Sequence, residues 1–555
     1  MIKKVKVLIA TFSQPKYLFS YAFLILLLLL FRNPFSQRTL IPNLEPYPDT
    51  IHYLTPARSF VMGGPFKIIR EGRTTDPGVS PLYSTFLIPF YFINIDVRVF
   101  YIANVLLSLT SLILFFWILK KITEDKWIIG FTLFLFATNF FVYWYPQWAM
   151  AENLILPLYL GGVVLLVSKT SIVNLLLAGF VSASFYGVKY ASVPLTAVYG
   201  LLYFIKIIFD LQGNKNLLFK KLGIYVLFLT VFLVGIVLYG YSINGVNPVS
   251  GIISIIRAFF GKITQGVSSV AQVSNPWMSV MYVKTNLPMY LNGLIGRSER
   301  FLWDFTPLVP VWVGVSGVIG LIAGCFTPQK TRYLSISLIA LLLSQILFMS
   351  MFYAVDMRYI YFAIPTLLLG FSLLLGNLRT ILMNRRVYSV FALIIFVAFG
   401  YYFFGNALRI KNQIVLNIKY AETPWYYISV LKLNEYFVQE NIIKPVVISP
   451  MPPYYIDYYS NGNYRLLPLS PVQEFRSGKV QAWGDYNYSD LHGVYRKVLE
   501  EGGRLYVSTY GLGNEAYLHR AFDDLRNDFV LKEVSNNCYE LCKIYKLELK
   551  NGKNI

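Results

Sequence analysis

Residues 17–31 read YLFSYAFLILLLLLF, an apolar run that follows Lys3, Lys4, Lys6 and Lys16. Ten further apolar runs occur between residues 99 and 404, and 56% of the 555 residues are hydrophobic, with a mean hydropathy of +0.53. This composition is typical of an integral membrane protein, and we predict about eleven transmembrane helices. They are expected at Tyr17–Phe31, Val99–Leu119, Trp127–Tyr145, Leu154–Val167, Ile172–Gly187, Ala191–Ile208, Leu222–Tyr241, Leu308–Cys325, Tyr333–Phe352, Tyr359–Gly376 and Val387–Phe404.

The charges between these runs predict their orientation. A cleaved signal peptide would begin like residues 1–31, but Arg32-Asn33-Pro34 follows instead of a small-residue cleavage site, which favours a retained helix. With the N-terminus inside, the inner segments hold 17 lysines and arginines against three acids. This asymmetry follows the positive-inside rule. We therefore expect an integral plasma-membrane protein with a cytoplasmic N-terminus and an extracytoplasmic C-terminal domain. The 14-residue run Leu82–Ile95 contains Pro89 and suits an interfacial or re-entrant helix.

The chain divides into a membrane module, residues 1–405, with outer loops 32–98 and 242–306, and a soluble α/β domain, residues 406–555. Strand and helix patterns alternate in that domain. Strands are predicted at Val446–Ser449, Arg504–Ser508 and Lys543–Leu549, and helices at Leu431–Glu440, Val494–Glu501 and Tyr517–Asp528. Cys325 lies in an apolar run, whereas Cys538 and Cys542 would pair only in an oxidising compartment.

The net charge of +21 has two readings. In a soluble protein it would suggest nucleic acid, but the sequence has no basic-aromatic recognition motif, so we expect no nucleic-acid partner. The loop cations instead set the topology and meet the anionic headgroups of membrane lipids.

A few charged residues at the outer ends of the helices are candidates for chemistry. Glu152 lies where an apolar run begins, and a carboxylate there either anchors the helix at the interface or has a function. Asp49 follows a proline and opens a predicted helix, which it would cap. Lys189 either snorkels to the interface or binds a phosphate. Arg358 either pairs locally with Asp356 or binds a lipid phosphate.

Carboxylates and cations at one membrane face suit transfer from a lipid-linked sugar phosphate. Cations stabilise the leaving phosphate, and a carboxylate deprotonates the acceptor hydroxyl. A donor that is already activated needs no nucleotide-binding loop, and the sequence has neither a Walker A motif nor a dinucleotide fingerprint. The main alternative is a transporter or flippase of lipids or lipid-linked glycans. Transporters commonly place charges near the bilayer midplane and show repeated halves, and neither feature is visible here.

The first outer loop resembles that of the GT-C membrane glycosyltransferases, especially the protein O-mannosyltransferases and aminoarabinose transferases. The similar segments run from Asp49 to Arg58, from Gly63 to Phe66 and from Asp76 to Tyr83. Ala151-Glu152-Asn153 and Met357-Arg358-Tyr359 resemble two further motifs of that family. Many relatives have paired acids in the first loop, where this chain has Asp49-Thr50.

The resemblance implies an inverting transferase that uses a polyprenyl-phosphate-linked sugar and an acceptor of unknown class. Asp49 would be the catalytic base and Glu152 a second active-site acid, and these two carboxylates would also hold a divalent cation, Mg or Mn, if one is used. By the same resemblance Arg358 would bind the donor phosphate. We also expect donor phosphate binding by Lys189, Lys67 and Arg70, and sugar or acceptor binding by His52, Tyr53, Tyr83 and Asp76.

Overall fold

The computed structural model divides the protein into two compact units, which are described separately. The first unit comprises Met1–Leu40, Val79–Thr264 and Trp277–Ile418, and the second comprises Ile41–Gly78, Gln265–Pro276 and Lys419–Ile555. The structure describes residues 14–31, 49–70, 73–95, 99–211, 213, 215–244, 278–295, 308–327, 329–352, 355–381, 397–398, 400–415, 433–450, 464–470, 472–474, 480–482, 490–509, 512, 516–538 and 542–550.

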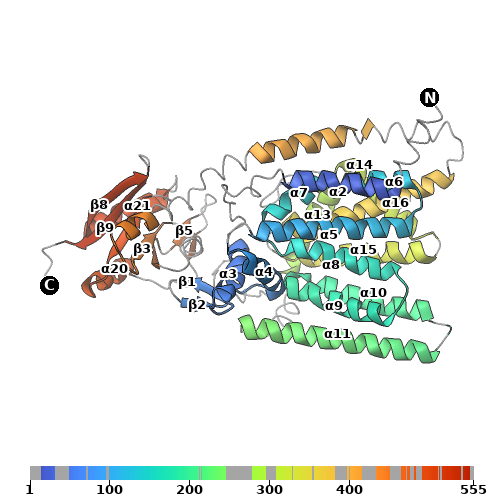
Figure 1. The fold of residues 1–555 in the computed structure, drawn as a ribbon, viewed down its shortest axis with the longest axis horizontal. Helices are drawn as coiled ribbons and strands as arrows, with labels where there is room; N and C mark the ends of the chain where they lie inside the picture. Colours follow the sequence, from blue (N-terminus) through green and yellow to red (C-terminus); the bar gives the residue numbers. More distant parts are fainter. Residues whose placement is uncertain are drawn as a thin grey trace. The chain divides into compact units, whose positions relative to one another are not determined.

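The first unit is a bundle of helices (Figure 1). Its α-helices are α2 (Pro15–Phe31), α4 (Pro81–Ile93), α5 (Val99–Ile122), α6 (Lys126–Ala137), α7 (Phe140–Trp144), α8 (Glu152–Val167), α9 (Ile172–Val188), α10 (Val193–Leu211), α11 (Lys215–Asn244), α13 (Val283–Leu294), α14 (Val311–Gly324), α15 (Gln329–Met349) and α16 (Ala363–Ile381). Residues 400–415 are also helical. The described residues of this unit also include four short 3₁₀ turns, η2 (Tyr145–Gln147), η3 (Tyr190–Ser192), η4 (Val280–Tyr282) and η5 (Met357–Ile360).

Ten of the eleven predicted apolar runs coincide with these helices. The run Trp127–Tyr145 is broken into α6 and α7, with a bend of 51° between them. The run Val387–Phe404 lies partly outside the described residues. Within the described part of the chain, four helices are long and apolar enough to cross a membrane, or five if the bent pair counts as one span. Eleven spans therefore remains a prediction.

Helix α11 has the length and composition of a membrane-spanning helix. It has 30 residues, and Leu227 and Leu238 on it are 60% and 61% exposed. About 20 apolar residues are enough for a helix to cross the hydrocarbon core, and α11 is longer than that. Its exposed leucines would be costly in water, whereas lipid tails are their natural surroundings.

The bundle brings α14 and α16 unusually close together. Positions 317 and 320 of α14 and position 370 of α16 are glycines that face the partner helix. A Cβ atom built on Gly320 would lie 1.8 Å from the carbonyl oxygen of Gly370. The two backbones can therefore approach only because side chains are absent, as in other membrane helix pairs with small residues at their interface.

The second unit is a small α/β domain together with the segment that contains α3 (Asp49–Val61), β1 (Ile68–Arg70) and β2 (Arg73–Thr75). Its five-stranded sheet has the order β4-β3-β7-β9-β8. Strands β3 (Val446–Ser449), β4 (Arg465–Pro468) and β7 (Leu505–Ser508) are parallel, while β8 (Phe529–Cys538) and β9 (Cys542–Leu549) run antiparallel. A separate hairpin pairs β5 (Val472–Glu474) with β6 (Val480–Ala482).

Helices α20 (Leu491–Glu500) and α21 (Ala516–Asp528) pack against this sheet (Figure 1). Tyr495, Leu505 and Leu547 are fully buried in the core that results. The predicted strands at Val446–Ser449, Arg504–Ser508 and Lys543–Leu549 are present, as are the predicted helices, whereas β4 and β8 were not predicted. The side chains of Cys538 and Cys542, where a disulfide was considered, lie outside the described residues.

The glycine contact between α14 and α16 predicts a sharp difference between two alanine substitutions. Gly320→Ala would force the helices apart, and we expect it to lower the free energy of unfolding by about 1–3 kcal/mol. Gly235→Ala on α11 is the matched control because no atom lies within 4 Å of its added Cβ. An SDS unfolding titration of the purified protein measures both, and equal stabilities would contradict the close packing.

Candidate active site

The buried polar residues of the first unit centre on Glu152, the first residue of α8. Its carboxylate is 3% exposed, and its Oε1 accepts a hydrogen bond from Nζ of Lys189 in a salt bridge. The Lys189 side chain is 13% exposed. Because α8 and α9 are packed neighbours joined by residues 168–171, the start of α8 and the end of α9 lie at the same end of the bundle. The local topology therefore brings these two residues together.

The backbone around Lys189 is fixed on both sides. Lys189 itself is extended, with φ −153° and ψ 122°, between α9 and η3. On one side, the Tyr186 N–H donates to Thr196 Oγ1 at 3.1 Å. On the other, Asn244 Nδ2 donates to the Tyr190 hydroxyl at 2.8 Å, and Gln345 Nε2 donates to the Ala191 carbonyl at 3.1 Å. Contacts from α10, α11 and α15 thus hold the turn that presents the ammonium group.

A second buried ion pair joins Asp356 and Arg358. Arg358 Nε donates to Asp356 Oδ2 at 2.6 Å, and the Arg358 backbone N–H donates to Oδ1 at 3.0 Å. Asp356 thereby caps η5 and holds the guanidinium in one orientation. The Tyr290 hydroxyl of α13 lies 3.2 Å from the Asp356 backbone nitrogen and 3.3 Å from its carbonyl oxygen. Both charged side chains are less than 10% exposed.

The two ion pairs form one polar cluster, which we define as Glu152, Lys189, Asp356 and Arg358. The Lys189 ammonium lies 4.2 Å from the centre of the Tyr359 ring, next to Arg358 in the sequence. The charges of both Lys189 and Arg358 stabilise the ionised Glu152 carboxylate. Two acids and two cations balance each other in the cluster, which is how charges are kept out of bulk water at tolerable cost.

Two asparagines hold the backbone that leads into Glu152. Asn104 on α5 and Asn153 on α8 both donate through Nδ2 to the carbonyl oxygen of Trp148, at 2.9 and 2.8 Å. Arg358 Nη1 lies 3.1 Å from Met150 Sδ in the same segment. These bonds fix residues 145–151, and with them the point at which α8 begins. The segment is irregular backbone in an apolar bundle, so its polar groups need such partners.

Tyr83 is the one predicted sugar- or acceptor-binding residue in the first unit. It is fully buried on α4, and its hydroxyl donates to Asn104 Oδ1 at 2.8 Å. It lies close enough to Glu152 for the carboxylate charge to act on it. The structure therefore gives Tyr83 a contact that supports the cluster, while its role in binding stays a prediction.

The other predicted site residues belong to the second unit. Asp49 begins α3, and its side chain, like that of Arg70, lies outside the described residues. His52 is half-buried on α3, and Tyr53 is 4% exposed. Lys67 and Asp76, predicted to have separate roles, form a salt bridge of 2.8 Å with each other and are both exposed. Their roles, and that of Asp49, stay predictions.

The side chains around Glu152 show whether they could bind the predicted divalent cation. Within the described residues, no group of three or more His, Cys, Asp and Glu side chains is placed to hold a metal ion. The Glu152 carboxylate forms a salt bridge with the Lys189 ammonium, and the Asp356 carboxylate forms one with the Arg358 guanidinium. Lysine and arginine already supply the positive charge there that a metal would supply.

Residues that support the cluster were mostly missed from the sequence. Glu152, Lys189 and Arg358 were singled out because charges next to apolar runs are rare. Asn104, Asn153 and Tyr290 give no such signal by themselves. The contact between Glu152 and Lys189 was not predicted either, although the assigned topology places the start of one span beside the end of the next.

Comparisons with known proteins identify the fold. No family model and no curated protein matches the chain. Solved structures do match, and they are GT-C membrane glycosyltransferases. ArnT from Cupriavidus metallidurans, in a crystal structure bound to undecaprenyl phosphate, is similar over 95% of this chain and 97% of its own, with 12% identity and a TM-score of 0.57.

The archaeal oligosaccharyltransferase AglB from Archaeoglobus fulgidus is also similar. Its structure, a complex with an inhibitory peptide and a dolichol-phosphate, matches over 98% of this chain and 74% of that one, with 12% identity and a TM-score of 0.51. The chain thus has a GT-C-like fold, and the resemblance first seen in its sequence motifs is confirmed at the level of the fold.

The salt bridge at the start of α8 predicts an asymmetric mutational response. Glu152→Gln leaves the largely buried Lys189 ammonium without its carboxylate, and we expect a loss of about 3 kcal/mol in the free energy of unfolding. Adding Lys189→Met should recover most of that loss because no unpaired charge remains. Asp76→Asn, which breaks the exposed pair with Lys67, should cost less than about 1 kcal/mol.

An SDS titration of the single and double variants measures these changes. If Glu152→Gln were no more costly than Asp76→Asn, the ion pair would not be buried as described.

Proposed function

We propose that this protein is a membrane glycosyltransferase that moves a sugar from a polyprenyl-phosphate-linked donor to an acceptor hydroxyl on the extracytoplasmic side of the plasma membrane. The observation that carries the proposal is the polar cluster, which fixes an ammonium and a guanidinium at one end of an apolar bundle. The GT-C-like fold supports it, because ArnT and AglB were solved with undecaprenyl phosphate and dolichol-phosphate, respectively.

In the proposed reaction the acceptor oxygen attacks the sugar C1 from the face opposite the phosphate. The C1–O bond to the phosphate breaks as the new C1–O bond forms, so the configuration inverts. Asp49 takes the proton of the acceptor hydroxyl, and the electron pair of the broken bond stays on the polyprenyl phosphate. Arg358 and Lys189 stabilise the charge that develops on that leaving group.

Both cations can keep their carboxylate partners while they bind a phosphate. A lysine ammonium has three N–H donors and a guanidinium has five, so one ion pair does not exhaust either group. The carboxylates therefore orient the cations before the donor arrives, which is the arrangement that makes electrostatic stabilisation effective. In this proposal Glu152 acts by positioning Lys189 as well as being an active-site acid.

We propose that Lys67 and Arg70 contribute to phosphate binding, and that His52, Tyr53, Asp76 and, from the first unit, Tyr83 contact the sugar or the acceptor. In the described structure Lys67 has Asp76 as its partner, so a phosphate would share Lys67 with that carboxylate.

The proposal predicts distinct kinetic effects for the base and for a phosphate ligand. With purified protein and labelled lipid-linked sugars, Asp49→Asn should lower the release of polyprenyl phosphate by about 10²–10⁴-fold, because the acceptor loses its base. Lys189→Gln should lower it by about 10²–10³-fold through loss of transition-state stabilisation. Lys215→Gln, which removes an exposed lysine at the start of α11, is the control and should be neutral.

Unchanged turnover by Asp49→Asn would remove Asp49 from the role of base. If the wild-type protein consumed no lipid-linked sugar from a broad panel, a transporter would become the better interpretation.

Metal chelation provides a further test. Because Lys189 already neutralises Glu152, we expect EDTA to leave the release of polyprenyl phosphate within about twofold of its untreated value. A loss of activity in EDTA that Mg²⁺ or Mn²⁺ restores would contradict this expectation and favour a metal held with the help of Asp49.

A further inference from the structure

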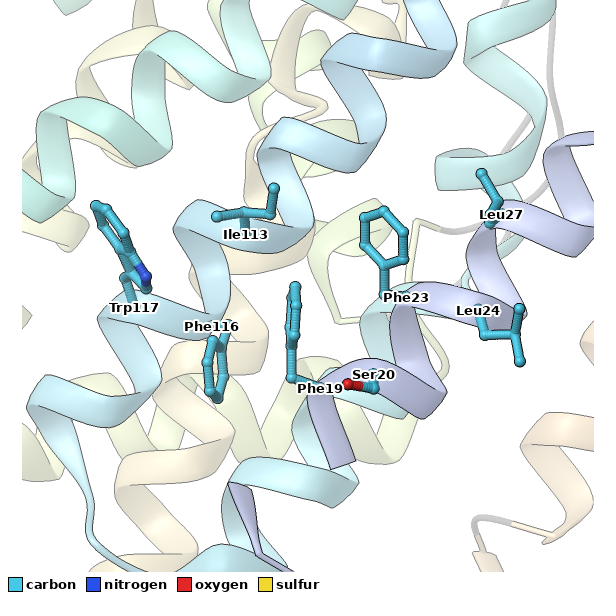
Figure 2. A pocket seen from close by; sticks show the side chains of 8 residues that line it. All are labelled: Phe19, Ser20, Phe23, Leu24, Leu27, Ile113, Phe116 and Trp117. Atoms are coloured by element: carbon cyan, nitrogen blue, oxygen red, sulfur yellow. The ribbon is translucent and has the colours of Figure 1, made fainter. Parts of the chain in front are cut away.

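A groove on the apolar surface of the first unit lies between α2 and α5, about 570 Å³ in volume (Figure 2). Seven of the eight residues that line it are apolar, with Ser20 as the exception. Leu24 and Trp117 are 50% and 56% exposed, so the groove opens on the surface of the bundle. Two of the lining residues, Phe19 and Phe116, stack their rings with centroids 4.7 Å apart.

Two lysines lie at one end of this groove. Lys16 precedes Phe19 by one turn of α2, and Lys120 follows Phe116 by one turn of α5. The Phe19 ring stacks on Phe116, and the Tyr101 hydroxyl donates to the Leu30 carbonyl oxygen, so the two helices run antiparallel. Both steps therefore lead toward the same end of the groove. Lys120 Nζ lies 5.6 Å from the centre of the Phe116 ring. Both lysines are exposed, and neither has a carboxylate partner among the described residues.

This end is remote from the polar cluster. Asn104, which supports the segment leading into Glu152, lies near the start of α5, whereas Lys120 is near its end. Asn104 and Lys120 are sixteen positions apart on this helix, roughly 24 Å along its axis. A lipid whose phosphate sits at the polar cluster therefore cannot place that same phosphate at Lys16 and Lys120.

We propose that this groove binds a phospholipid with an anionic headgroup, its phosphate between Lys16 and Lys120 and one acyl chain along Phe19, Phe23 and Trp117. The apolar lining suits a hydrocarbon chain, and the paired cations select the headgroup. By the predicted topology, the lysines face the cytoplasmic leaflet, where anionic lipids attract basic residues near the membrane surface. This site is separate from the proposed transferase chemistry and does not rest on it.

Trp117 allows a direct test, because brominated acyl chains quench tryptophan fluorescence on contact. The protein is reconstituted in phosphatidylcholine vesicles that contain rising fractions of brominated phosphatidylglycerol or brominated phosphatidylcholine. The Trp117 signal is the difference between the wild-type protein and Trp117→Phe. We expect half-quenching at a lower mole fraction of phosphatidylglycerol than of phosphatidylcholine. Lys16→Gln and Lys120→Gln should each reduce that preference by about fivefold.

Lys215→Gln is the matched control and should leave the preference intact, since this exposed lysine lies on α11. Equal quenching by the two lipids would overturn the proposal, as would a preference that survives removal of both lysines. A groove filled by residues 1–13 or by a second copy of the chain would leave Trp117 unquenched by either lipid. Displacement by unbrominated undecaprenyl phosphate at a lower mole fraction than by phosphatidylglycerol would assign the groove to the polyprenyl carrier instead.

Discussion

The structure of the first unit around the polar cluster depends on the buried salt bridge between Glu152 and Lys189. Removing two charges from water costs several kcal/mol for each, and only a well-placed partner offsets that cost. The partner is available because α8 and α9 are antiparallel neighbours. The same pairing fixes where α8 must begin, and the two asparagines that bind the Trp148 carbonyl hold that starting point. The packing of α8 against α9 therefore also determines the geometry of the polar cluster.

Much of the helical framework could be predicted because the bilayer leaves few alternatives. Backbone polar groups have no water in the hydrocarbon core, so an apolar run of sufficient length must be helical. The broken run at α6 and α7 was not predicted, since Asn139 in its middle looks like an ordinary polar residue. In the structure Asn139 caps α7, accepting from the Phe141 N–H at 2.9 Å, and the bend follows.

Contacts between distant residues were harder to predict than elements. Asp356 and Arg358 are two positions apart, so their pairing could be weighed directly, whereas Glu152 and Lys189 are 37 positions apart. In the second unit β4 and β8 were missed for local reasons. Strand β4 ends in a proline, and β8 contains charged residues and two register shifts, which weaken the alternation on which strand prediction depends.

The two ends of the first unit use positive charge in different ways. At the polar cluster each cation has a carboxylate that holds it in place, so its orientation does not depend on a ligand. Lys16 and Lys120 are exposed and have no such carboxylate within the described residues, so their charge attracts anions without fixing a geometry. A reacting phosphate needs cations that are oriented beforehand, because reorienting them would add to the barrier. A lipid headgroup needs only attraction, and this difference is why we place the chemistry at the cluster and the lipid at the groove.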